Sequence, residues 1–118
     1  MLPAHPEASG FLPLTPATFH ILLALAGGER HGYAIMQEIA EGTGGALRVG
    51  PGTLYGSLKR LVSDGLVEEV DDRAADDPRR RYYRLTGLGR AVAGAEALRL
   101  DSMVRTARSR KLIGPAST

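Results

Sequence analysis

The fold is decided by residues 50–65, GPGTLYGSLKRLVSDG, which have the pattern of one amphipathic helix between two turn residues. Pro51 suits the first helical position, because the backbone N–H that proline lacks has no partner there, and Gly65 suits the position after the helix end. The apolar side chains recur at i, i+4, i+7 and i+8, at Leu54, Leu58, Leu61 and Val62. This spacing predicts a helix that packs on a core by one side only.

The opposite side of this helix is small and polar, as a surface that docks on a partner requires. It holds Gly52, Thr53, Gly56, Ser57, Lys59, Arg60 and Ser63, with Tyr55 on its flank. Glycine inside a helix is less favourable than alanine by about 0.5–1 kcal/mol, so Gly56 needs a reason other than stability. Gly56 lies about 200° from Leu54 around the helix, so we expect no neighbouring helix to crowd it and a partner to approach it closely.

Two helices are expected before this one. Thr15 and Pro16 are an N-cap and a first-turn proline, and the apolar residues that follow run to the Gly27, Gly28 stop. A second helix is predicted from about His31 to Thr43, with glycines after it. Residues 47–49 are predicted to form a short extended stretch that leads into the third helix.

A β-hairpin is predicted after the third helix. Residues 67–71 and 79–85 have strand character, and the intervening residues 72–78 are rich in turn formers. Alternation places Arg81, Tyr83 and Leu85 on one face of the second strand.

A long final helix is expected from its N-cap Thr86 to about Lys111. One apolar seam repeats at spacings of four and three, at Ala93, Ala97, Leu100, Val104 and Ala107. A second seam lies on nearly the opposite side, at Leu88, Ala91, Ala95 and Leu98. A helix buries only one side on its own small domain, so two seams imply a second copy of the chain. We predict dimerisation through the first seam, although Leu100 and Val104 packing on the first helix is the alternative.

The composition is that of one globular domain. The 118 residues are 43% hydrophobic and 24% charged, and the chain has no cysteine, which excludes a disulfide scaffold and a thiolate metal site. No signal peptide or membrane span is apparent, so a cytoplasmic protein is expected, without a membrane partner. His5 and His20 lack a second ligand at metal-binding spacing, so neither a metal site nor a cofactor is predicted.

The net charge of +2 conceals an asymmetry along the chain. Residues 1–78 contain five Lys/Arg against eleven Asp/Glu, and residues 79–118 contain ten against two, so the balance changes from −6 to +8. Such a distribution suggests a surface for a polyanion, although runs of charge are more often solvated surface.

Together these elements predict a mainly α fold with a small β-hairpin, arranged as a winged helix-turn-helix. The expected parts are an irregular N-terminal arm at 1–14, a winged-helix domain at 15–85 and a C-terminal dimerisation helix at 86–113. In such folds the third helix lies in the DNA major groove, and the hairpin, or wing, meets the flanking backbone.

Four strings make the resemblance specific. HGY at 31–33, GPGTLYGSLKRL at 50–61, DGLVEE at 64–69 and RRRYYRLTGLGR at 79–90 resemble the PadR family of transcriptional regulators, and the similarity extends from about Leu14 to Leu112. The resemblance implies a homodimeric repressor that binds a palindromic operator in double-stranded DNA and is released by a small molecule or stress signal. It places the recognition helix at 51–64, the wing at 67–85 and the dimerisation helix from Thr86 onward, as in short-tailed members.

The expected DNA contacts come from the third helix and the wing. Asp71, Asp72, Asp76 and Asp77 surround the wing tip and would be repelled by phosphate, so arginines are expected to make the wing contact instead of the tip as a whole. The predicted contact residues are Pro51, Gly52, Thr53, Tyr55, Gly56, Ser57, Lys59, Arg60, Arg73, Arg79 and Arg80. Of the arginines at 79–81, Arg81 is the weakest candidate, because it shares a face with Tyr83 and Leu85.

Three further expectations concern the rest of the chain. An effector site is predicted between the last helix and the first, lined by Phe19, Leu23 and Leu98, because a ligand there would change the angle between protomers. Tyr33 and Tyr83 are predicted to be core aromatics, and His31 to be a structural residue at a helix start. No nucleophile, base and oxyanion arrangement is apparent, so an enzyme is not expected. The competing hypothesis is a winged helix that binds protein instead of DNA.

Overall fold

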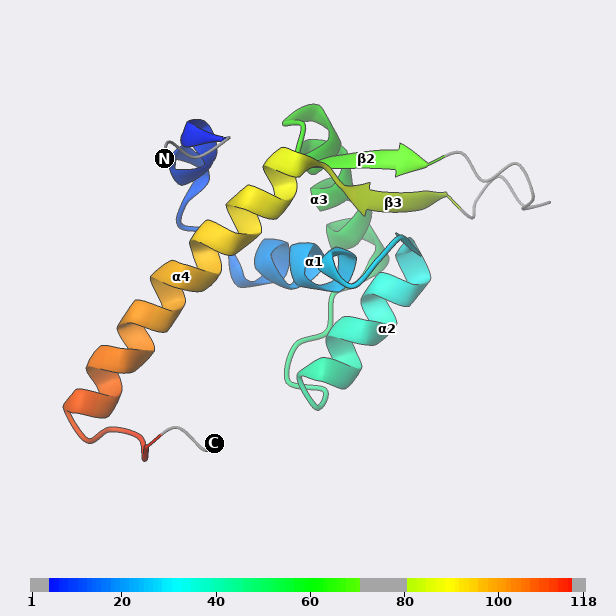
Figure 1. Ribbon diagram of the computed structural model, residues 1–118. Coiled ribbons are helices and arrows are strands. Elements are labelled where there is room, and N and C mark those ends of the chain that lie inside the picture. Colours follow the sequence, from blue (N-terminus) through cyan, green and yellow to red (C-terminus); the bar gives the residue numbers. More distant parts are fainter. Residues whose placement is uncertain (1–4, 71–80, 116–118) are drawn as a thin grey trace.

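The computed structural model describes residues 5–70 and 81–115, which fold into helices around a small antiparallel sheet (Figure 1). Its α-helices are α1 (Pro16–Ala26), α2 (Gly32–Gly42), α3 (Pro51–Ser63) and α4 (Gly87–Ser109). A short 3-10 helix, η1 (Pro6–Phe11), precedes them, and the strands are β1 (Arg30–His31), β2 (Val67–Val70) and β3 (Tyr82–Leu85). This order confirms the predicted mainly α, winged-helix fold with a C-terminal helix.

Side chains at the helix starts satisfy backbone N–H groups that have no partner within the helix. The Thr15 hydroxyl accepts a hydrogen bond from the Thr18 N–H at 3.2 Å, and the Thr86 hydroxyl accepts one from the Gly89 N–H at 3.0 Å. Helix α2 begins one residue later than predicted, because His31 is its N-cap. The His31 Nδ1 atom accepts from the Ala34 N–H at 3.1 Å, which agrees with a structural role for this histidine.

The sheet contains a strand that the sequence analysis missed. Its order is β1-β3-β2, and β1 adds Arg30 and His31 to the predicted hairpin by pairing with Tyr83 and Tyr82. Residues 47–49, predicted to be extended, pair with no strand among the described residues. Instead, the Thr43 hydroxyl accepts from the Leu47 N–H at 3.0 Å and holds this segment as a connection to α3. Two residues are too few to show the alternation of apolar and polar side chains that marks a strand. Strand β1 is therefore recognisable only from its pairing with β3.

The core lies where α1, α2, α3 and the sheet meet. The apolar stripe of α3 is buried as predicted through Leu54, Leu58 and Leu61, whereas Val62 remains 37% exposed at its edge. The other fully buried apolar side chains are Ile21, Leu22, Leu25, Ile35, Leu66, Val67 and Val92. Tyr83 is 5% exposed, so the prediction that it is a core aromatic is confirmed. Burial, and then the nearby Glu69 carboxylate, raise the pKa of Tyr83.

The N-terminal arm is more ordered than predicted. Residues 6–11 form η1, which packs against α4, and its Ala8 is 6% exposed. The Leu14 N–H donates a hydrogen bond of 2.6 Å to the buried Glu96 carboxylate on α4. The prolines of the arm, and the lack of regularly spaced apolar residues, predict an irregular backbone. They cannot reveal that the arm packs on α4, because the partner Glu96 lies 82 residues further along the chain.

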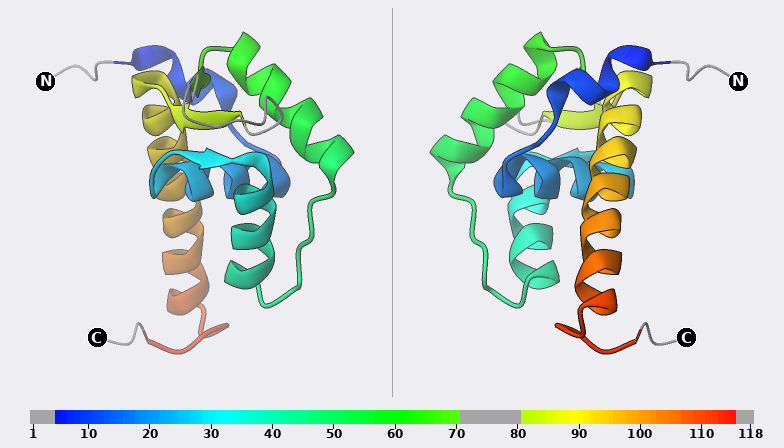
Figure 2. Two further views of the ribbon diagram at one scale, coloured as in Figure 1. Left: turned by 90° about the vertical axis from the view of Figure 1, so that its right-hand side faces the viewer. Right: turned by 90° about the vertical axis from the view of Figure 1, so that its left-hand side faces the viewer.

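Helix α4 starts at the sheet, passes α1, and then projects beyond the rest of the molecule (Figures 1 and 2). Its N-terminal half is fixed to the domain through Gly89, Val92, Ala93 and Glu96, which are all buried. Its C-terminal half has mostly exposed side chains. In the described ranges, no helix combines the length and apolar character needed to cross a membrane.

Candidate nucleic-acid interface

Helix α3 presents one side to the core and the other to solvent. Lys59 and Arg60 are exposed, and Thr53 and the half-exposed Tyr55 lie nearer its N-terminal end. Pro51, Gly52 and Gly56 are exposed as well. We call this set the outer face of α3: Pro51, Gly52, Thr53, Tyr55, Gly56, Lys59 and Arg60.

Gly56 lies open in the middle of this outer face. A Cβ atom built on Gly56 would have no neighbouring heavy atom within 4 Å, other than those of its own helix backbone and chain neighbours. The expectation that no other helix of the domain crowds Gly56 is therefore confirmed.

The predicted placement of Ser57 on the polar side is wrong. Ser57 is only 4% exposed. It lies three residues after Leu54 and four before Leu61, so helical geometry places it beside the core stripe. The spacing alone contains this information, because Ser57 is about 60° from Leu54 and about 100° from Gly56.

The wing has paired charges at its base. Arg84 on β3 contacts Glu68 at 2.6 Å and Glu29 at 3.3 Å, and Arg81 contacts Glu69 at 3.5 Å. These arginines are paired with carboxylates of β2 and, at Glu29, of the residue that precedes β1. The remaining predicted wing residues lie outside the described part of the chain: Arg73, Arg79 and Arg80, together with Asp71, Asp72, Asp76 and Asp77.

Tyr33 is not a core residue, contrary to the prediction. It is 64% exposed, because it lies about 160° around α2 from the buried Ile35. Sequence reasoning therefore missed an exposed aromatic side chain close to α3. The signal that could have found it is its angular position relative to Ile35 and Ile39, the two buried isoleucines of α2.

The predicted dimer seam on α4 is partly occupied by the domain itself. Ala93 is 7% exposed and belongs to the core cluster, so it is not free to contact a second copy. Its neighbours further along project past the domain: Ala97 is exposed, Leu100 half-buried and Val104 38% exposed. Ala107 is half-buried and lies close to the end of the helix. We call Ala97, Leu100, Val104 and Ala107 the free seam of α4.

Two of the three residues predicted for an effector site are strongly exposed. Phe19 is half-buried, but Leu23 is 45% and Leu98 70% exposed. One hollow of about 250 Å³ lies elsewhere, between Phe11 and Leu14 of the arm and Ser57 and Arg60 of α3.

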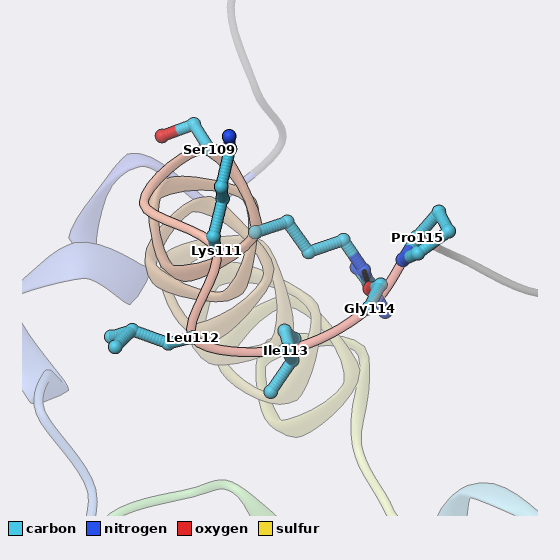
Figure 3. A pocket seen from close by; sticks show the side chains of 7 residues that line it. Ser109, Lys111, Leu112, Ile113, Gly114 and Pro115 are labelled. Atoms are coloured by element: carbon cyan, nitrogen blue, oxygen red, sulfur yellow. Dashed lines mark hydrogen bonds between the residues drawn. The ribbon is translucent and has the colours of Figure 1, made fainter.

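A larger hollow of about 710 Å³ lies where the chain turns back after α4 (Figure 3). There the Arg108 side chain donates to the Gly114 carbonyl at 3.2 Å and closes the turn. Among the described residues, no group of three or more His, Asp or Glu side chains could hold a metal ion.

Comparisons with known proteins agree with this architecture. The family model described as the transcriptional regulator PadR-like family matches residues 21–95. The transcriptional regulator Rv3488 of Mycobacterium tuberculosis is 40% identical over 86 residues, which are 73% of this chain and 77% of the relative. The structure of H. salinarum RosR has 33% identity and a TM-score of 0.59, and the match covers 90% of this chain and 84% of that chain.

A third similar structure is Bacillus subtilis PadR in complex with operator DNA. It is 24% identical with a TM-score of 0.62, and the match covers 70% of this chain and 47% of that chain. At this identity the likeness shows the shared fold. The family model and the M. tuberculosis relative are specific enough to show more: the chain belongs to the PadR-like family of transcriptional regulators.

Proposed function

We propose that this protein is a sequence-specific DNA-binding regulator whose helix α3 enters the major groove. The observation that carries the proposal is the outer face of α3, which is exposed, carries two cations and has open space at Gly56. The major groove, about 12 Å wide, admits one helix, and a position without a side chain lets that helix approach its floor closely. The fold is shared with B. subtilis PadR, which was solved in complex with operator DNA, and this supports DNA as the partner.

The residues of the outer face divide into three roles. Lys59 and Arg60 bind phosphates or guanine, and Thr53 reaches base edges by hydrogen bonds. Tyr55, whose hydroxyl end rests against Gly32 of α2, contacts the DNA through the exposed part of its ring. Pro51, Gly52 and Gly56 keep the N-terminal half of the helix close to the DNA. Ser57 has no part in this proposal, because it is buried on the side of α3 that packs on the core. At the wing, Arg73, Arg79 and Arg80 are the proposed phosphate contacts.

The proposed assembly is a homodimer through the free seam of α4. Exposed apolar side chains on a helix that projects from its domain are stabilised when a second copy covers them. A two-fold dimer presents two α3 helices, and two half-sites one helical turn apart, about 34 Å, then form a palindromic operator. Repression follows if that operator overlaps a promoter.

Release by a small molecule or stress signal completes the proposal. A ligand that changes the angle between protomers changes the separation of the two α3 helices, and so lowers affinity for a site of fixed spacing. Phe19, Leu23 and Leu98 remain the proposed contacts, because a ligand bound to them would change how α4 lies against α1.

The test is selection of bound sites from randomised duplex DNA, followed by salt titration with the selected duplex. We expect enriched half-sites related by a dyad, and an affinity that falls steeply with salt because phosphate contacts release counterions. Lys59→Ala should reduce the salt slope by about one unit on every duplex, whereas Thr53→Ala should change sequence preference. Ser102→Ala, on the exposed part of α4 and on the side away from the free seam, is a control that removes no charge.

Salt-insensitive or undetectable DNA binding by the wild-type protein would contradict the proposal and favour the protein-binding alternative.

A further inference from the structure

Three aromatic side chains lie on or beside the outer face of α3, of which Tyr33 and Tyr55 are exposed and His31 is half-buried. We call His31, Tyr33 and Tyr55 the aromatic ledge; Tyr33 is 64% exposed and Tyr55 44%. The rings of His31 and Tyr33 stack with centroids 6.5 Å apart and planes inclined by 21°. Because His31 is fixed as the N-cap of α2, this stacking restrains the direction of the Tyr33 ring. A tyrosine that is exposed and restrained is suited to contact a partner with its hydroxyl.

The ledge is continuous with the outer face of α3 through Tyr55. A Cβ atom built on Gly32 would lie 2.5 Å from the Tyr55 hydroxyl oxygen, so this hydroxyl end rests on the backbone of Gly32. Gly32 directly precedes Tyr33. Tyr55 thus spans from the helix proposed to enter the groove to the first turn of α2, and a duplex seated on α3 extends toward Tyr33.

We propose that the Tyr33 hydroxyl donates a hydrogen bond to a DNA backbone phosphate beside the groove that α3 occupies. This inference rests on the proposed function. In helix-turn-helix proteins the helix before the recognition helix crosses the DNA backbone, and tyrosine hydroxyls are among the side-chain groups that bind phosphate oxygens. His31 is the positioning residue, because its ring holds that of Tyr33 in place.

A tyrosine–phosphate contact has a signature that a lysine–phosphate contact lacks. Tyrosine is uncharged, so its hydrogen bond displaces no condensed counterion and leaves the salt slope unchanged. A phosphate contact also carries no sequence information, so its loss weakens binding to all duplexes alike. Together these properties separate Tyr33 from Lys59, which changes the slope, and from Thr53, which changes the preference.

The experiment compares Tyr33→Phe, Lys59→Ala and wild type on the selected duplex and on an unrelated duplex of equal length. The salt range is about 50–200 mM. Tyr33→Phe keeps the ring and removes one hydrogen bond, so we expect affinity to fall about two- to tenfold on both duplexes with the slope unchanged. Tyr33→Glu should abolish binding, because it places a negative charge beside a phosphate. The melting temperature should stay the same, since Tyr33 is exposed.

Each result decides between defined alternatives. If Tyr33→Phe and Tyr33→Glu bind like wild type while Lys59→Ala weakens binding, the tyrosine contact is disproved and the proposed function stands. A changed sequence preference in Tyr33→Phe would also overturn the inference, because it would indicate a base contact. If wild type shows no salt-dependent binding to any duplex, the failure is that of the proposed function.

Discussion

Two glycines in helices show how one residue type serves opposite purposes. Gly89, in the first turn of α4, is buried, and a Cβ atom built on it would overlap the Leu66 carbonyl oxygen. Gly56, in α3, has no such neighbour. Helix propensity alone predicts that alanine stabilises both positions. The structure indicates that only Gly56 follows this rule, because the backbone of Leu66 cannot move aside as a flexible side chain would.

We therefore expect Gly56→Ala and Gly89→Ala to change stability in opposite directions. Gly56→Ala should raise the free energy of unfolding by about 0.5–1 kcal/mol while operator affinity falls or stays the same. Gly89→Ala should lower the free energy of unfolding by several times that amount, because α4 must shift away from the backbone of Leu66, the residue before β2. Denaturant unfolding of both variants, with operator titration of the first, measures these effects.

Two results would contradict this picture of the glycines. A stabilised Gly89→Ala variant would show that the close contact with Leu66 is not required. Wild-type operator affinity in Gly56→Glu would show that this side of α3 is not in the groove.

At the scale of elements, the sequence predicts where the helices lie better than it predicts which side of each helix is buried. Serine suits a surface and tyrosine a core, but Ser57 is buried and Tyr33 exposed, as their angular positions relative to the buried residues of their helices indicate. Cap residues were predictable, because Thr15 and Thr86 act on backbone groups within three residues. Strand β1 and the docked arm were not, because both depend on partners far away in the sequence.

The contact between the arm and α4 depends on one buried carboxylate. Glu96 is 1% exposed, pairs with Arg99 and accepts from the Leu14 N–H. The hydrogen bond from Arg99 and that from Leu14 lower the pKa of Glu96, and burial opposes them. A lowered pKa in the folded state means that the ionised form stabilises the fold above the carboxylate's ordinary pKa, and that this contribution is lost as the pH falls through the folded value.

We expect Glu96→Gln to be less stable than wild type at neutral pH, with the difference narrowing as the pH decreases below the ordinary carboxylate range. Glutamine has nearly the same shape but cannot pair with Arg99 as an anion. Urea unfolding of both proteins at several pH values tests this. Asp101→Asn is the matched control, because Asp101 pairs with Arg105 at 2.8 Å on the exposed part of the same helix. A difference that is constant with pH would assign the effect of Glu96→Gln to packing.

At the scale of the whole molecule, the order of elements was sufficient to predict the architecture. The leucine stripe of α3, the hairpin and the final helix each have a local pattern, and their succession is specific to a winged helix. Which apolar residues of α4 pack on its own domain and which stay exposed was not predictable, because both halves of the helix carry apolar residues at the same spacing. Only the packed structure shows that Ala93 is in the core while Val104 is not.

The two seams of α4 can be distinguished by a matched pair of substitutions. Leu100, on the free seam, and Leu98, on the other seam, lie about 200° apart around the helix. Leu100→Asp should convert the dimer to monomers, because a charge left unpaired in an interface costs several kcal/mol. Leu98→Asp should leave the dimer intact, since Leu98 is 70% exposed and faces away from that seam. Light scattering at micromolar concentration, with thermal unfolding to confirm the fold, measures both.

Val104→Asp is a second variant on the free seam, in case Leu100→Asp loses the dimer only because it unfolds the monomer. Val104 is more exposed than Leu100, so its substitution disturbs the monomer less. If Leu100→Asp and Val104→Asp both give folded monomers, the free seam is the interface. If Leu98→Asp alone dissociates the dimer, the second seam is the interface, and Leu98 contributes to assembly instead of to an effector site. A wild-type protein that is monomeric at micromolar concentration would contradict both, and α3 would then bind single half-sites with no fixed spacing.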